Sequence, residues 1–407
     1  MCNFSHVHCH SQYSMLDGLS SIELYITECK KLGFDALAIT DHGNMHGVVE
    51  LYNQAKAANI HSVMGVEFYS TAFGVDLSDK NRQQNHLLAL AQTQEGYQNL
   101  LKLSQISYVD GFYYKPRISI VELEKYNKGL VVTSGCMAAH IPQAIIDGNF
   151  VQAEKMVQWY QNVFGDRFFI ELQCHPGIPE LSSINKVLLE YSKKYNIKCI
   201  LTNDAHYARK EDAVHHDILL CVQTKSTIDK PDRFKFTDHE YYLKSPEEME
   251  KLFLPYIDGE TIKEYMVNTY ELAHSCHSSP ALDTTTHMPV PEINGLVNPD
   301  EFLRELVYNN VANVYPDWET NDKVKAQIEE ELSVVQLTKF ASYFIIIWDI
   351  CNAAKSKKIG YNTRGSAAGS IINYIIGVSF VDPLENGLMF SRFLNTVPHI
   401  NYDHLGI

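Results

Sequence analysis

Short apolar runs alternate with amphipathic stretches along the first two-thirds of the chain. Runs rich in β-branched residues are typical of strands, and apolar residues recurring at helical spacing are typical of helices. The predicted strands are Phe4–His10, Ala36–Thr40, Ser62–Phe68, His86–Ala91, Gly129–Thr133, Arg167–Gln173 and Lys198–Thr202. The helices expected between them include Ser21–Leu32, Val48–Ala58, Gly96–Gln105 and Pro179–Tyr195. This alternation favours parallel strands in an α/β barrel or wound sheet, with one strand fewer than a complete eight-stranded barrel.

The pattern becomes mostly helical after Asp238. Within Glu240–Phe253, the sequence Ser245-Pro246-Glu247-Glu248 is a helix start signal. Further helices are predicted at 261–276, Pro299–Tyr315 and Asn321–Ala354, and the Pro-containing stretch Ser278–Asn298 is predicted to be a linker. We therefore expect one domain over residues 1–275, a linker and helical connector over 276–340, and a third region over 341–407.

Charge and cysteine content narrow the classes of function. The chain has 407 residues, and its 34 Lys and Arg against 49 Asp and Glu give a net charge of −15. That charge excludes a globally basic nucleic-acid binder but leaves room for a local basic groove. The nine cysteines form no C-x-x-C motif, which favours free thiols in a reducing compartment. No signal peptide or membrane span is visible, so we expect a cytoplasmic protein without membrane contacts.

Metal-ligating residue types recur at one end of the predicted strands. Most of them lie at or just beyond the C-terminal end of a strand, which is the functional face of an α/β barrel. Each alone has a structural explanation: His-x-His can be a surface accident, Asp41-His42 a turn, and Cys136 a buried small side chain. Their conjunction favours a multinuclear site, and the donor set suits zinc, manganese or iron better than magnesium. Residues of these types occur in His6–His10, at Asp17, in Asp41-His42, at Glu67, His86 and Cys136, and in Asp204-Ala205-His206.

The motifs that carry these residues resemble a known family. HVHCHSQYSMLDG, AITDHGN, GVEFY, NHLLALA, TSGC and TNDAHY are similar to the PHP domain, and in particular to the one that opens the bacterial C-family replicative polymerases. The resemblance implies a distorted seven-stranded (β/α) barrel with up to three divalent metal ions. The nine candidate ligands that it implies are His8, His10, Asp17, His42, Glu67, His86, Cys136, Asp204 and His206. By analogy, Glu67 bridges two metals. The first is held with His8, His10 and Asp204, the second with His86 and Cys136, and the third by Asp17, His42 and His206.

A cluster of divalent ions is suited to phosphate ester hydrolysis, because bound water becomes hydroxide near neutral pH and charge on the reacting oxygens is neutralised. The loop GFYYKPRI, residues 111–118, adds two cations to this hypothesis. Lys115 and Arg117 can clamp a phosphate or contact a DNA strand. The alternative is a solvated loop with packed tyrosines. For Lys115 the sequence favours neither interpretation over the other, whereas for Arg117 it slightly favours the functional one.

The last third resembles the beginning of the palm domain of the same polymerases. The similarity rests on ASYFIIIWD (341–349), RGSAAGS (364–370) and PLENGLMFSRFLN (383–395). A loop of small residues lets backbone N–H groups approach phosphate oxygens closely. The structural alternative is tight helix packing by small residues. The resemblance implies that a nucleotide triphosphate is seated by Arg364, Gly365, Ser366 and Ser370.

The palm segment departs from the family pattern in two places. Tyr361-Asn362-Thr363 replaces a Gly-Pro-Gly sequence, and His399 and Asn401 stand where two magnesium-binding carboxylates are expected, leaving Asp403. Imidazole and amide groups are poor ligands for a hard cation. We therefore expect a partial, degenerate palm that binds no magnesium, and no polymerisation by this chain alone.

The leading hypothesis is a replication-associated, metal-dependent phosphoesterase of the 3′–5′ exonuclease type. Its partners would be DNA, as a single strand or a primer end, and other replisome subunits or a separate chain carrying the rest of a polymerase. One alternative is a non-catalytic or split polymerase fragment that acts through protein contacts. A weaker alternative is a small-molecule phosphatase.

Overall fold

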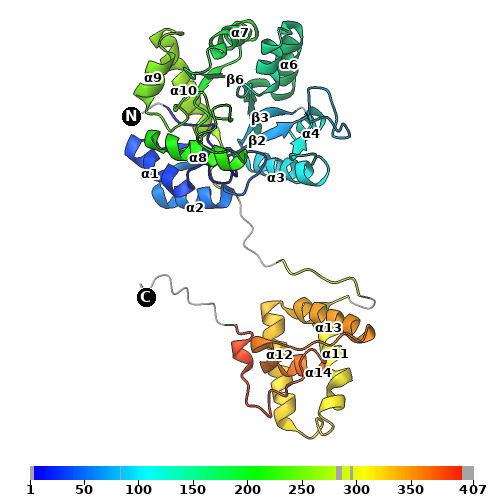
Figure 1. The fold of residues 1–407 in the computed structure, drawn as a ribbon. Coiled ribbons are helices and arrows are strands. Elements are labelled where there is room, and N and C mark those ends of the chain that lie inside the picture. The colour runs from blue at the N-terminus through cyan, green and yellow to red at the C-terminus, as the bar shows by residue number, and fades with distance from the viewer. Residues whose placement is uncertain (1–3, 83, 281–286, 294–296, 397–407) are drawn as a thin grey trace. The chain divides into compact units, whose positions relative to one another are not determined.

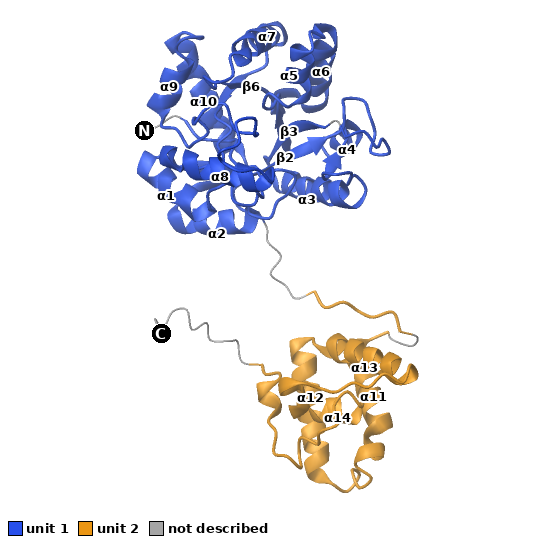
Figure 2. Ribbon diagram, in the orientation of Figure 1, with its two compact units in different colours: residues 1–282 blue, residues 283–407 orange. Residues whose placement is uncertain are grey.

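The computed structural model describes residues 4–82, 84–280, 287–293 and 297–396. The chain divides into two compact units, residues 1–282 and residues 283–407, which are called unit 1 and unit 2 below (Figure 2). Each unit has its own hydrophobic core.

Unit 1 is built on one seven-stranded sheet that curls into a distorted barrel. Its strands pair in the order β1-β2-β3-β5-β6-β7, and the short β4 pairs with β2. Six of the seven predicted strands are confirmed. The strands are β1 (Ala36–Ile39), β2 (His61–Ser70), β3 (Asn85–Ala91), β4 (Arg117–Ile118), β5 (Leu130–Thr133), β6 (Phe168–Gln173) and β7 (Cys199–Thr202).

The segment predicted as the first strand, Phe4–His10, pairs too briefly to count as one. It forms isolated parallel bridges on both sides, from His6 to Leu37 of β1 and from Cys9 to Ala205 just after β7. Ala38 N donates to His6 O at 3.0 Å, and His10 N donates to Ala205 O at 2.7 Å. This segment therefore joins the two edges of the sheet and closes the barrel.

Strand β3 runs antiparallel to both of its neighbours, β2 and β5, whereas the alternation of strands and helices predicted parallel strands throughout. The cause is the connection between β2 and β3, residues 71–84, in whose described part no helix forms to carry the chain back across the sheet. The reversal has a consequence for function. His86 is the second residue of β3 and is paired in register with Tyr69 near the end of β2, so it lies at the same end as the C-terminal ends of the parallel strands.

Helices surround the sheet (Figure 1). Helix α1 shows why they begin and end where predicted: Ser21 accepts from Leu24 N, and Gly33 ends the helix in a left-handed conformation with φ of 76°. The predicted start at Ser245 is confirmed by a capping box with Glu248. The helices of unit 1 are α1 (Ile22–Leu32), α2 (Val48–Ala58), α3 (Gln94–Val109), α4 (Ile120–Lys125), α5 (His140–Ile146), α6 (Phe150–Phe164), α7 (Glu180–Tyr195), α8 (Ala213–Gln223), α9 (Pro246–Phe253) and α10 (Gly259–Ser275), with 3₁₀ turns η1 (Gly165–Arg167) and η2 (Lys210–Asp212).

Side chains alternate between the two faces of the sheet, and this alternation sets where the site can form. In β3, Leu87 and Ala89 pack outward against the helices, whereas Leu88 and Leu90 join a second apolar cluster with Leu272 of α10. Apolar side chains therefore fill the interior beside α10, and polar side chains gather at the other end of the strands.

Unit 2 is helical. Its elements are α11 (Pro299–Val314), α12 (Asp322–Thr338), α13 (Ala341–Ser356), α14 (Ile371–Ile375), η3 (Gly365–Gly369) and η4 (Phe390–Arg392). The stretch predicted as helical over Asn321–Ala354 forms two helices, α12 and α13. Lys339 between them adopts a left-handed conformation, and the chain bends there by 112°. The bend lets Val335 and Phe344 enter one core, which includes residues on both sides of position 340.

No single helix among the described residues is long and apolar enough to cross a membrane. The bent pair α12 and α13 passes the same test of length and composition when taken together.

Candidate metal centre

The structure brings the nine candidate ligands together at one end of the barrel. They come from seven parts of the chain: the 4–10 segment, the loop before α1, the ends of β1, β5 and β7, and strands β2 and β3. Contacts of 4.0 Å or less link every one of them to at least one other member.

Glu67 is the central residue of this cluster. Its buried Oε1 lies 3.2 Å from His8 Nε2 and 3.3 Å from Cys136 Sγ. Its Oε2 lies 2.8 Å from His42 Nδ1, 3.1 Å from His86 Nδ1 and 3.5 Å from His10 Nε2. A carboxylate with neighbours on both oxygens is placed to bridge two cations.

Asp204 supplies the second carboxylate from the end of β7. Its Oδ1 lies 3.3 Å from His8 Nε2 and 3.1 Å from His10 Nε2. The backbone at Asp204 has φ of 49°, a left-handed conformation that is uncommon outside glycine and that clusters at functional sites.

Asp17 approaches from the loop before α1. Its Oδ2 lies 3.0 Å from His42 Nε2, and its Oδ1 lies 4.0 Å from His206 Nε2. Gly18 makes this approach possible, since a Cβ there would lie 2.0 Å from Ser11 O.

Two residues that the sequence analysis missed hold the histidine rings in orientation. Glu171 Oε1 lies 2.7 Å from His8 Nδ1, and Ser14 Oγ lies 2.9 Å from His10 Nδ1. Such outer partners fix a ring so that its other nitrogen faces the metal. Glu171 is a buried carboxylate inside the apolar strand β6, and a carboxylate at such a position in the sequence is a signal that could have found it.

The imidazoles and carboxylates shift one another's pKa values. Burial raises the pKa of Glu67, but His86 and His8 outweigh it and hold that pKa well below its usual range. Burial lowers the pKa of His42, since it disfavours the charged imidazole, but the neighbouring carboxylates outweigh burial and raise this pKa to about 10. Burial, aided by two nearby imidazoles, lowers the pKa of His10 to about 3. Protons thus offset the negative charge of the cluster, and bound cations would replace those protons.

The cluster passes a structural test for metal binding. Buried polar atoms normally have hydrogen-bond partners, and orphaned ones ask for an explanation. Here five of the ligand atoms are buried without a hydrogen bond: His8 Nε2, His10 Nε2, His42 Nδ1, Glu67 Oε2 and Asp204 Oδ1. Three groups have ligand atoms within 4.8 Å of one another, namely His8–His10–Asp204, His42–Glu67–His86 and His10–His42–His206. The first is the group expected from the resemblance, and the donor set suits divalent cations.

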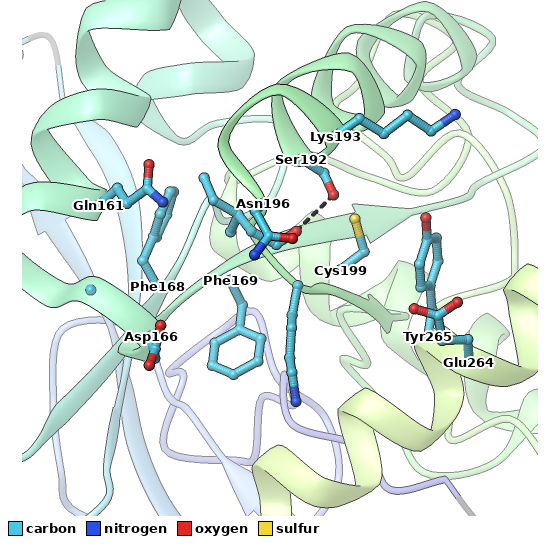
Figure 3. A pocket seen from close by; sticks show the side chains of 13 residues that line it. Gln161, Asp166, Phe168, Phe169, Ser192, Lys193, Asn196, Cys199, Glu264 and Tyr265 are labelled. Atoms are coloured by element: carbon cyan, nitrogen blue, oxygen red, sulfur yellow. Dashed lines mark hydrogen bonds between the residues drawn. The ribbon is translucent and has the colours of Figure 1, made fainter.

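The cluster opens into a pocket of about 440 Å³, called the site pocket below. Ligand residues form part of its lining, and His175, Phe234, Phe236 and Tyr241 form another part. A second cavity of about 580 Å³ lies at the opposite ends of the strands, beside Phe168 and Cys199, which begin β6 and β7 (Figure 3). Because its lining contains no histidine and lies away from the cluster, it is not the candidate site.

The two cations of the 111–118 loop have different surroundings. Lys115 Nζ is 3.2 Å from Tyr69 Oη, and the Tyr69 ring stacks on His42 with 5.8 Å between centroids. Lys115 therefore stands at the edge of the cluster. The Arg117 guanidinium is buried and donates to Gly111 O, Asn81 O and Asp79 O at 3.1 Å, so its position gives no support to a phosphate contact.

In unit 2, the 364–370 loop divides into an exposed and a buried part. Arg364, Gly365 and Ser366 are exposed. Ser370 is fully buried, and its hydroxyl donates to Glu331 Oε2 at 2.7 Å. Ser370 is thus engaged within the core, while the first three remain accessible. His399, Asn401 and Asp403 lie outside the described residues.

Comparison with known proteins identifies the class of the first unit. Residues 6–175 match the PHP domain family, and this range holds seven of the nine clustered residues. Unit 1 therefore contains a PHP domain. Residues 301–400 match the family described as the bacterial DNA polymerase III alpha NTPase domain. The chain thus joins a PHP domain to a segment of the bacterial DNA polymerase III alpha family.

Similarity to whole proteins extends along nearly the entire chain. The DNA polymerase III subunit alpha of Borreliella burgdorferi is 37% identical over 400 residues, which cover 96% of this chain and 34% of that protein. The subunit alpha of Thermus aquaticus is 35% identical, with coverage of 98% and 38%. This chain therefore spans about a third of the length of the curated relatives it matches. Among solved structures, an amidohydrolase from Chromobacterium violaceum is 16% identical, covering 50% of this chain and 87% of its own, with a TM-score of 0.33.

Proposed function

We propose that unit 1 is a metal-dependent phosphodiesterase that removes nucleotides from the 3′ end of a DNA strand. The observation that carries the proposal is the set of buried ligand atoms that lack hydrogen bonds, in a cluster that opens into the site pocket. The similarity to polymerase III alpha subunits supports DNA as the substrate.

The nine clustered residues would hold up to three divalent ions of zinc, manganese or iron. Bound there, such ions supply hydroxide near neutral pH and stabilise charge on the attacking and leaving oxygens. Glu67 is central to the cluster and would bridge. Glu171 and Ser14 keep His8 and His10 oriented.

Lys115 provides the cation that meets the substrate. It is exposed at the edge of the cluster and lies over the Tyr69 ring, with Nζ 4.8 Å from the centroid. A phosphate entering the site pocket would gain a charge-assisted hydrogen bond there. This local positive charge matters because the net charge of −15 repels DNA.

The test combines metal analysis with cleavage of labelled DNA. We expect purified protein to contain divalent metal and, with manganese, to shorten a 5′-labelled primer–template stepwise from its 3′ end. Bis(p-nitrophenyl) phosphate and p-nitrophenyl phosphate separate diester from monoester hydrolysis, and monoester hydrolysis alone would indicate a small-molecule phosphatase. Protein that binds no metal and cleaves none of these substrates would refute the proposal and favour a role through protein contacts.

For the remainder of the chain we propose a replisome setting. Unit 2 matches the polymerase family, so a separate chain or other replisome subunits are the partners that fit it. Arg364, Gly365 and Ser366 are the residues of its loop that are free to meet a phosphate.

A further inference from the structure

One wall of the site pocket is aromatic, and none of the proposed metal chemistry uses it. This wall consists of His175, Phe234, Phe236 and Tyr241. The Tyr241 ring stacks on His175 at 4.0 Å and 12°, and Phe236 lies 4.4 Å from Tyr241. The Phe234 ring meets Phe236 edge-on, with 6.2 Å between centroids and 87° between planes.

The wall adjoins the metal cluster directly. The Phe236 ring meets the candidate ligand His206 edge-on, with 5.0 Å between centroids and 80° between planes. A group lying against Phe236 would therefore be next to a phosphate held at His206. On the other side of the cluster, Tyr69 and Lys115 adjoin His42.

Phe234 is the exposed member of the wall. Its side chain is 55% exposed, whereas Tyr241 is only 7% exposed. A scattered exposed apolar residue needs no explanation, but an exposed aromatic residue that lines a pocket beside a cluster of candidate metal ligands is typical of a binding surface.

The chain on both sides of Phe234 and Phe236 is anchored. Arg233 Nη1 donates to Asp217 Oδ1 at 2.6 Å, and its second Nη group reaches the other carboxylate oxygen. Asp238 Oδ2 accepts from Gly177 N at 2.8 Å. The two phenyl rings are thus presented by a fixed loop, which also carries the exposed Lys235.

A further polar group points to a ligand at this wall. His175 is buried, and both of its ring nitrogens lack a hydrogen-bond partner within the described residues. Buried polar groups in native proteins are rarely left in this state.

We propose that Phe234 forms a stacking platform for the base of the terminal nucleotide, with the Phe236 ring standing edge-on behind it. This inference rests on the proposed phosphodiesterase function and deepens it. Stacking needs a free base face and tolerates every base, so the substrate class is a DNA end whose last base is unpaired, with no preference for sequence. The platform acts on binding and positioning of the substrate.

The first test compares Phe234→Ala with the wild-type chain on 5′-labelled single strands. For ends that carry a base, we expect kcat/KM to fall about 5- to 150-fold, the range given by base–aromatic stacking. For a strand ending in an abasic nucleotide, we expect no change. Phe150→Ala is the matched control, because Phe150 is also 50% exposed but does not line the site pocket. Equal losses on abasic and base-bearing ends would overturn the proposal.

The second test measures binding without turnover. In Phe234→Trp, indole emission should be quenched by single-stranded DNA with a terminal base and not by an abasic end or a blunt duplex. The three native tryptophans are accounted for by titrating the wild-type chain. Quenching without any DNA hydrolysis would retain the platform and refute the proposed activity. Equal quenching by all three ends would overturn the platform itself.

Discussion

At the site of unit 1, buried polar atoms of the clustered residues contact one another without forming hydrogen bonds, whereas buried polar groups of the 364–370 loop in unit 2 are hydrogen-bonded. Every buried side-chain polar atom found without a partner lies in unit 1, and none lies in the described part of unit 2, residues 287–293 and 297–396. Both regions belong to the parts of the chain that match known families.

The pairing in unit 2 comes from one residue. Glu331 of α12 is fully buried and accepts from Ser370 Oγ at 2.7 Å, Ile371 N at 2.9 Å and Ile372 N at 3.2 Å. A carboxylate there occupies the N–H groups that a phosphate loop would offer. The comparison shows that a group of buried polar atoms can bind a ligand only where the protein has not already hydrogen-bonded those atoms itself.

Loss of the second carboxylate of the cluster should give the largest effect. We expect Asp204→Asn to lower any phosphodiesterase kcat by about 1,000-fold or more, because removing a metal ligand costs several kcal/mol of charge stabilisation. Asparagine keeps the shape and tolerates the left-handed backbone, so the circular dichroism spectrum should be unchanged. His10→Ala should behave alike, and full activity with metal still bound in either variant would contradict a metal-centred site.

The closed region should show a pH dependence of stability. Burial raises the pKa of Glu331 to about 7, although its hydrogen bonds partly oppose this shift. Because the folded state then binds a proton that the unfolded state has released, unit 2 should lose stability as pH rises from about 4.5 to about 7. The loss is about 3 kcal/mol at most.

Urea unfolding of the full chain at pH 5 and pH 8, followed through Trp318 and Trp348 in a Trp159→Phe background, measures this loss. Glu331→Gln should remove the difference between the two pH values. The same pH difference in that variant would show that another group is responsible.

Metal removal should separate the two units. A ligand at 100 times its Kd stabilises the folded state by about 2.7 kcal/mol, so a chelator should lower the unfolding temperature of unit 1 and leave that of unit 2 unchanged. Calorimetry with and without chelator tests this. In Asp204→Asn, the chelator should no longer change the unfolding temperature of unit 1. An equal decrease in the unfolding temperatures of both units would mean that the metal site is not confined to unit 1.

The smallest expected effect concerns an outer residue. Glu171→Gln should reduce metal affinity or activity about 10- to 100-fold, since it weakens the hold on His8 without removing a ligand. Glu154→Gln, on the surface beside Lys194, is the control and should be neutral. If excess metal restores the activity of Glu171→Gln, the variant has lost metal affinity and not catalytic capacity.

Some features of this chain are encoded locally and could be predicted from the sequence. Six strands follow from β-branched runs, and the starts of α1 and α9 follow from Ser21 and Ser245. The expectation of a metal cluster follows from metal-ligating residue types that recur at strand ends. Each of these signals acts over a few residues, through backbone hydrogen bonds and the period of the side chains.

Other features were decided only by the tertiary structure. The antiparallel direction of β3 brings His86 to Glu67, and the 4–10 segment closes the barrel through two bridges. Glu171 meets His8 across 163 positions, and Glu331 meets Ser370 across 39. The left-handed conformation of Lys339 separates α12 from α13, although the sequence on both sides of it favours helix. Contacts between distant residues depend on how whole elements pack, and no local pattern of propensity or charge contains that information.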